Sequence, residues 1–142
     1  MIDGGEPAEF IARRLTILES EDIGNANPPA LNLASSTLNI VKHIVYPEAR
    51  ISLSQLVIYL ASSPKSNSAY MAINTALKDI AAGEIHPIPS HIKTHAKAYL
   101  YPHDFGGWVE QSYLPVPKQY YTTQQIGFEK TLWEWHEKIK SK

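Results

Sequence analysis

The sequence predicts an all-α helical bundle with a long, ordered, proline-rich arm. Apolar residues recur at three- and four-residue spacing in five separate segments, while the strict alternation of a half-buried strand is sustained nowhere. Five prolines between Glu84 and Tyr121 forbid a long helix in that span, because proline lacks the backbone N–H that a helix interior needs.

Length and composition indicate one domain spanning residues 1–142. The chain is long enough to bury a core without covalent staples, and it has no cysteine, which excludes disulfides and zinc–thiolate sites. Its 13 Lys and Arg residues nearly balance 14 Asp and Glu residues, so charge gives no domain-wide reason to bind nucleic acid. No apolar run approaches the roughly 20 residues of a membrane span, and no signal peptide is visible. We therefore expect a cytoplasmic protein without a membrane partner.

The first two helices are expected on either side of a break. Pro7 suits a first helical turn, where its missing N–H costs nothing. The apolar pattern that follows consists of Phe10, Ile11, Leu15 and Leu18. Glycine, asparagine and proline interrupt it over residues 20–29, SEDIGNANPP. The second stripe, which Pro47 ends, consists of Leu31, Ala34, Leu38, Val41 and Val45.

The third and fourth helices are expected around the stretch SSPKS, residues 62–66. The third runs from about Glu48, and its inward residues are Leu53, Leu56, Val57 and Leu60. The fourth starts near Pro64 or Ser66 and ends at Gly83. Its buried face is expected to hold Tyr70, Ile73, Ala76, Leu77 and Ile80.

The remaining chain consists of the arm and a last helix. Within the arm, the sequence predicts only a short helical turn around residues 90–100, SHIKTHAKAYL. The last helix covers about residues 128–140, with a buried face formed by Phe128, Leu132, Trp135 and Ile139. No internal repeat or flexible linker interrupts the pattern, which supports a single domain.

The stretch YPHDFGGW, residues 101–108, has the densest chemistry in the chain. Tyr101, His103 and Asp104 could be a base with its orienting carboxylate, but neighbouring residues on a chain point in different directions. No nucleophile motif such as GxSxG accompanies them. We therefore expect no catalytic residue in this stretch.

A structural role for the same stretch is favoured. Pro102 restricts one backbone angle, and Gly106–Gly107 permit angles that other residues avoid. The same loop also contains three large side chains with apolar rings, Tyr101, Phe105 and Trp108. We expect this loop to be fastened onto the bundle, with Phe105 as a buried anchor.

Other candidate sites are weak. The four histidines of the arm lack the ligand spacing of a zinc site, and they are His86, His91, His95 and His103. An anion could bind Lys65, Ser66 and Asn67 at the start of the fourth helix, although plain capping is favoured. The phosphate-binding pattern GxxxxGK[ST] is absent, so this chain alone is not expected to hydrolyse a nucleotide.

Several stretches occur in a fixed order, and together they resemble a known family. They are GGEPAEFIARRL (4–15), SEDIGNANPPAL (20–31), YLASSPKSNSAYMA (59–72), IPSHI (88–92) and YPHDFGGWVEQSYLP (101–115). The set is similar to the C-terminal domain of the AAA+ ATPases called RarA or MgsA in bacteria, whose eukaryotic relative is the Werner helicase-interacting protein. The resemblance runs from Gly4 to about Gly127, and five ordered motifs make it highly specific.

The resemblance implies an oligomerisation domain like the collar of clamp loaders, which assembles an ATPase into a homotetramer. It implies action in DNA replication, repair and recombination at stalled forks, in the bacterial cytoplasm near the nucleoid. ATP and Mg²⁺ would bind an N-terminal module outside this chain, so no catalytic, cofactor or metal residue is carried over. DNA and replication proteins would be partners of the whole protein. The motif residues carried over as structural are Tyr59, Pro64, Lys65, Ser66, Asn67, Tyr70, Tyr101, Pro102, His103, Asp104 and Phe105.

The chain departs from the family pattern in two places. Family members usually have a further helix before the GGE segment, and Met1–Asp3 would be the tail of that helix. They also have a longer stretch between the HI segment and the YPHDF motif, whereas here His95 is followed closely by Tyr99.

Two expectations concern surfaces. We expect the subunit contact on the third and fourth helices, Glu48 to Ala82, because small residues there permit close helix approach. These small residues are Ala61, Ser62, Ala69, Ala72 and Ala76. The alternative is a module that binds single-stranded nucleic acid by stacking bases on Tyr99, Tyr101, Tyr120 and Tyr121. The cations near those tyrosines are Lys93, Lys97 and Lys118.

Overall fold

The protein is helical, which confirms the all-α prediction. The computed structural model describes residues 1–141, and no strand occurs among them. The α-helices are α1 (Ala8–Leu18), α2 (Pro29–Val41), α3 (Ala49–Ser62), α4 (Ser68–Ala81) and α5 (Phe128–Lys140). A π-turn, η1 (Glu19–Ile23), and three 3-10 turns complete the set: η2 (Gly24–Ala26), η3 (Ser90–Ile92) and η4 (Pro102–Phe105). Within residues 1–141 no helix is long and apolar enough to span a membrane.

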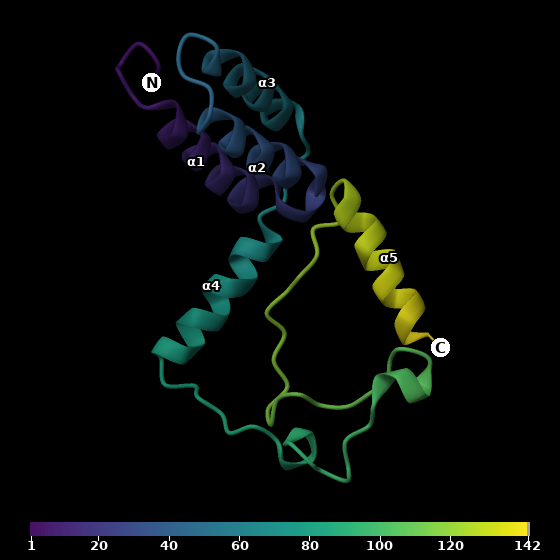
Figure 1. Ribbon diagram of the computed structural model, residues 1–142. Helices are drawn as coiled ribbons and strands as arrows, with labels where there is room; N and C mark the ends of the chain where they lie inside the picture. Colours follow the sequence, from purple (N-terminus) through teal and green to yellow (C-terminus); the bar gives the residue numbers. More distant parts are fainter. Residues whose placement is uncertain (142) are drawn as a thin grey trace.

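Helices α1, α2 and α3 form a compact bundle at one end of the molecule (Figure 1). Their buried side chains form two apolar clusters. One contains Ala8, Ile11, Ala12, Val41, Ala49 and Leu53. The other contains Ile23, Ala30, Ala34, Leu56 and Leu60, and Leu15 packs against both. Alanines recur in both clusters, and their small side chains let the helix backbones approach closely.

Helices α4 and α5 leave the bundle and diverge (Figure 1). They contact the bundle mainly through η1 and η2, the turns that connect α1 to α2. Residues 82–127, called the arm below, join the far end of α4 to the start of α5, passing beyond both helices before returning between them (Figure 1). Two short 3-10 turns lie in the arm, and the helical turn predicted over residues 90–100 is reduced to η3.

The break predicted after α1 lies at Gly24, within the expected residues 20–29. The chain continues through η1, because Ile23 is fully buried in the second cluster and the π-turn keeps it there. The direction changes at Gly24, where φ is +47° and an added Cβ would lie 3.1 Å from the carbonyl oxygen of Ser66. Glycine is favoured at this position for both reasons. The expected end of α2 was wrong, since the helix stops at Val41.

The buried faces expected for the outer helices are wrong within one copy of the chain. On α4 only Ser68 is buried, and the apolar residues predicted to face inward are exposed: Tyr70, Ile73, Leu77 and Ile80. The same holds on α5 for Phe128, Trp135 and Ile139, and in the bundle for Phe10, Leu18, Leu31, Val45 and Val57. The reason is geometric, because α4 and α5 diverge and no other part of residues 1–141 covers these faces.

The three-helix bundle should be sensitive to cavities. Leu56 is 0% exposed at the centre of the second cluster, so Leu56→Ala should lower the free energy of unfolding by about 2–5 kcal/mol. Ile58, on the same helix, is 64% exposed, and Ile58→Ala should change the free energy of unfolding by less than about 0.5 kcal/mol. Urea denaturation of the two variants measures the difference, and equal losses would contradict this packing.

Candidate functional site: a helix junction and the apolar surface around it

A buried carboxylate joins α4, α5 and the arm. Glu129, in the first turn of α5, is 0% exposed. Ser66 Oγ and the backbone N–H of Gln124 each donate to Oε2 over 2.9 Å. Tyr121 OH donates to Oε1 over 3.0 Å, and Ser68 Oγ donates to the same oxygen. Both oxygens are therefore fully hydrogen-bonded by groups from the start of α4 and the end of the arm.

These hydrogen bonds determine the charge state of Glu129. Burial alone would raise its pKa, because a charged group loses solvation in the protein interior. The donors on Ser68, Ser66, Gln124 and Tyr121 favour the charged form more strongly, so the pKa of Glu129 lies below its usual value. Glu129 is thus an ionised structural group at neutral pH.

The predicted motif between Tyr59 and Tyr70 forms the other half of this junction. Lys65 Nζ donates to the carbonyl oxygens of Leu60 and Ser63 over 2.7 and 2.8 Å, so the ammonium group caps the C-terminus of α3. Ser63 Oγ donates to the carbonyl oxygen of Tyr59 over 2.8 Å and accepts from Asn27 Nδ2 over 2.9 Å. Lys65 therefore points toward α3 and not toward an external anion.

The start of α4 does bind an anion, but an internal one. The carboxylate of Glu129 accepts from Ser66 and Ser68, at the helix start where the sequence offered Lys65, Ser66 and Asn67 to an anion. Asn67 Oδ1 accepts from Gln124 Nε2 over 2.6 Å. Gly127 brings α5 against this junction, since an added Cβ would lie 2.3 Å from the carbonyl oxygen of Ala26. Ser66 and Asn67 thus form hydrogen bonds that join the start of α4 to α5 and to the end of the arm.

The second motif lies elsewhere. Pro102–Phe105 forms η4 in the arm, closed by hydrogen bonds from Asp104 N to Tyr101 O (3.0 Å) and from Gly107 N to Pro102 O (2.8 Å). The rings of Tyr101 and His103 lie 5.0 Å apart. Phe105 is 51% exposed, so the expectation that it anchors this loop in the bundle is wrong within one copy. The two motifs are not brought together.

His91 and Gln111 form hydrogen bonds within the arm. No set of three or more metal-ligating side chains gathers within residues 1–141. His91 donates from Nε2 to the carbonyl oxygen of Ser112 over 2.7 Å. Gln111 bridges the arm by accepting from Leu100 N (3.2 Å) and donating to Leu100 O (2.8 Å). These bonds tie residues 91–114 into a self-supported loop.

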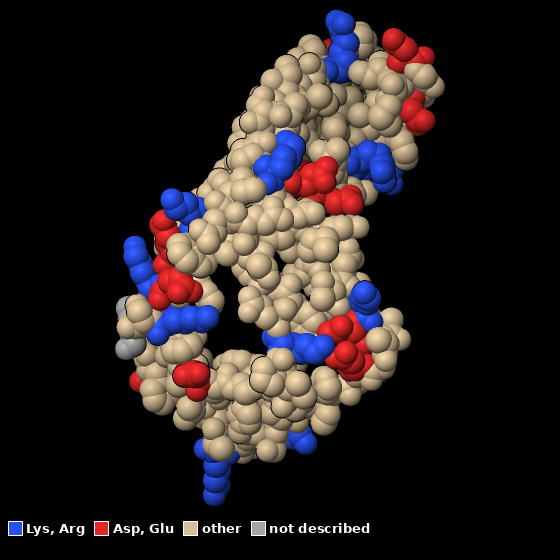
Figure 2. Space-filling model, turned by 180° about the vertical axis from the view of Figure 1, so that it is seen from behind, with Lys and Arg blue, Asp and Glu red and all other residues tan. Residues whose placement is uncertain are grey.

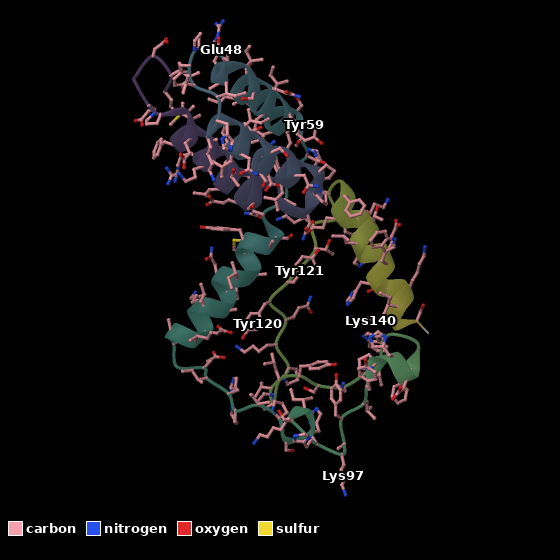
Figure 3. All side chains as sticks on the ribbon, viewed as in Figure 1. Glu48, Tyr59, Lys97, Tyr120, Tyr121 and Lys140 are labelled. Carbon is pink, nitrogen blue, oxygen red and sulfur yellow. The ribbon has the colours of Figure 1, made fainter. Side chains whose placement is uncertain are left out.

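The base of the arm is held by charge. Lys118 Nζ lies 2.8 Å from Asp79 and 2.5 Å from Glu84, and these contacts raise the pKa of Lys118. The hydrogen bond from Lys118 likewise lowers the pKa of Asp79. Tyr120 and Tyr121 lie on the returning part of the arm, between α4 and α5, while Lys97 projects from its far end (Figure 3). A groove for a nucleic-acid backbone would therefore lack Lys118, and Tyr121 is already bonded to Glu129.

The surface around the junction is extensively apolar. An open groove of about 510 Å³ lies between the end of α1, η1 and the start of α4, lined by Thr16, Ile17, Ser20, Glu21, Ala69, Tyr70 and Ile73. An opening also passes through the molecule between α5 and the arm (Figure 2). Exposed apolar side chains on the arm include Ile85, Ile88, Tyr99, Leu100, Tyr113 and Val116.

The amount of exposed surface is abnormal for a monomer. The chain exposes 9991 Å² at a mass of 15.9 kDa, whereas a compact monomer of this mass exposes about 7,400 Å². Obligate contacts bury about 2,000–5,000 Å² over both partners, which is about 1,000–2,500 Å² for each subunit. The excess of about 2,600 Å² lies near the upper end of that range for one subunit. This exposed apolar surface is the candidate functional site of the chain.

Sequence reasoning missed Glu129 and Asn27. A glutamate in a first helical turn is ordinarily explained by the helix dipole, and an asparagine before two prolines by a turn. The signal available was the serine pair Ser66 and Ser68, whose hydroxyl groups need an acceptor when the segment is buried. The partner lies more than 60 residues away along the chain, and local sequence does not identify it.

Comparisons with known proteins identify several relatives of this chain. The family model described as "MgsA AAA+ ATPase C terminal" matches residues 1–140. The chain is 44% identical to Replication-associated recombination protein A of Bacillus subtilis, over 98% of this chain and 36% of that protein. It is 39% identical to an AAA domain-containing protein of Mycobacterium tuberculosis over 93% of this chain and 32% of that protein. It is 31% identical to "ATPase WRNIP1" of Dictyostelium discoideum over 82% of this chain and 15% of that protein.

These relatives are much longer than this chain. The chain spans about a third or less of the curated relatives it matches. The Bacillus alignment covers 154 positions, more than the 142 residues of this chain, so that relative carries residues within the region that this chain lacks.

Replacing the buried carboxylate tests the junction. Glu129→Gln should lower the free energy of unfolding at neutral pH by about 1.5–3 kcal/mol, the typical worth of hydrogen bonds to a charged group. Glu134→Gln, on an exposed position of the same helix, should have little effect. Chemical denaturation measures both.

The contribution of Glu129 to the free energy of unfolding has a defined pH dependence. Because the pKa of Glu129 is lowered on folding, its stabilisation is complete above the unfolded-state value of about 4.3 and is lost as pH falls through the lower folded-state pKa. The difference in stability between wild type and Glu129→Gln should therefore shrink below about pH 4. A difference that stays constant down to pH 3, or one that grows, would contradict the assigned role.

Proposed function

The chain belongs to the family of MgsA AAA+ ATPase C-terminal domains, and on that premise we propose that it is the oligomerisation domain of a clamp-loader-like AAA+ ATPase. The observation that carries the proposal is the excess of exposed apolar surface on α4, α5 and the arm. A monomer gains nothing from leaving these side chains in water, whereas a second copy of the chain would remove them from it.

The family resemblance supports an assembly of four copies. A closed tetramer needs either repeated head-to-tail contacts or two kinds of two-fold contact, and each subunit then buries surface on two sides. The exposed faces are distributed accordingly, since α4 and the groove beside it lie on one side of the molecule and α5 on the other (Figure 1). The contact proposed for the third and fourth helices is supported by the exposed side chains of α4.

ATP hydrolysis is assigned to other parts of the whole protein. The sequence contains no phosphate-binding loop, and this chain covers only 36% of the Bacillus relative. We assign to the whole protein the role in DNA replication, repair and recombination and the contacts with DNA and replication proteins. The printed name of that relative, Replication-associated recombination protein A, supports this role.

Light scattering tests the assembly. At micromolar concentration the mass should be about four times 15.9 kDa. Ile73→Asp places a charge on the exposed apolar face of α4 and should lower the mass, while the matched change Asn74→Asp on the same helix should not. Circular dichroism should show unchanged helix content in both variants. A wild-type mass of a single chain at this concentration would refute the proposed function.

A further inference from the structure

The groove beside α4 has an acidic rim. Glu21 lines it directly, and Asp22 follows as an exposed neighbour in η1. No lysine or arginine occurs between Arg14 and Lys42, and Arg14 lines a neighbouring hollow together with Glu21 and Asp22. Glu21 and Asp22 form no ion pair within residues 1–141. The groove thus combines an apolar floor, formed in part by Ile17 and Ile73, with an edge that carries two carboxylates without an ion-pair partner among the described residues.

The far end of the arm has the opposite character. No aspartate or glutamate occurs between Glu84 and Asp104, whereas Lys93 and Lys97 are exposed in that span and form no ion pair within the described part of the chain. Apolar side chains are exposed beside them, and they are Ile85, Ile88, Tyr99 and Leu100. We call residues 85–101 the arm tip; it is apolar and positively charged.

Within one copy the arm tip and the groove cannot meet. The groove adjoins the start of α4, at the bundle, while Lys97 lies at the end of the molecule farthest from the bundle (Figures 1 and 3). The loop is held in that position by its own hydrogen bonds and by the contacts of Lys118 with Asp79 and Glu84. Each surface is therefore available to another molecule.

We propose that the arm tip of one copy docks in the groove between η1 and α4 of a second copy, so that subunits associate head to tail. The apolar side chains supply buried area, and the opposite charges of Lys93 and Lys97 against Glu21 and Asp22 set the orientation. Such a heterologous contact leaves one free groove and one free arm tip on every pair, and it ends only when a ring closes. The inference rests on the proposed oligomerisation and specifies its contact.

A charge exchange tests the contact. The arm variant Lys93→Glu/Lys97→Glu and the groove variant Glu21→Lys/Asp22→Lys each place like charges opposite one another in a self-assembly. Each should raise the dissociation constant at least about tenfold by sedimentation velocity in low salt. An equimolar mixture of the two variants should regain the wild-type mass, because acidic arm tips then meet basic grooves, and basic arm tips meet acidic grooves. The control Lys42→Glu/Arg50→Glu in the bundle makes the same change in net charge as the arm variant and should leave the mass unchanged.

The outcomes separate this inference from the proposed function. A wild-type protein that is a single chain at micromolar concentration defeats both. A wild-type oligomer whose mass resists both charge reversals, or variants that dissociate but do not recover on mixing, overturns the head-to-tail contact alone. If the arm variant keeps its mass but loses salt-sensitive binding to a fluorescent single-stranded oligonucleotide, the arm tip is a nucleic-acid surface and the proposed contact is wrong.

Discussion

The arrangement of the outer elements depends on the hydrogen bonds to the buried carboxylate of Glu129. Four donors from α4 and the arm hold it, and through it α5 begins at the point where α4 also leaves the bundle. Both helices are thereby joined at their first turns and diverge beyond them (Figure 1). The same junction caps α3 through Lys65, so the bundle and the outer helices share one set of polar contacts.

This arrangement explains why so much apolar surface stays in water. Helices that are joined only at one end cannot cover each other along their length. The arm, which runs from the far end of α4 back to the start of α5, is internally hydrogen-bonded but almost without buried side chains. The bundle of α1–α3 buries apolar side chains in two clusters, whereas the apolar side chains of α4, α5 and the arm are largely exposed. The apolar side chains of these outer elements therefore stay exposed within one copy of the chain.

Helix positions and the buried residues of the bundle could be predicted from periodicity, as with Leu53, Leu56 and Leu60 on α3. The burial of α4 and α5 could not, because Ile73 or Trp135 has the same helical spacing whether its own chain or another covers it. The predicted burial of Phe105 is wrong for the same reason. Glu129 was not predictable because a charged residue in a first turn has an ordinary local explanation, and its partners Ser66 and Ser68 are distant in sequence.

Hydrogen–deuterium exchange as a function of protein concentration tests most directly whether a second copy covers the outer elements. Amide groups in α2, whose buried side chains lie in the core of one copy, should exchange at a rate independent of concentration. Amide groups in α4 and the arm tip should become markedly better protected as concentration rises through the dissociation constant. Protection of α4 and the arm tip that is identical in dilute and concentrated samples, including samples shown to be single chains, would contradict the account.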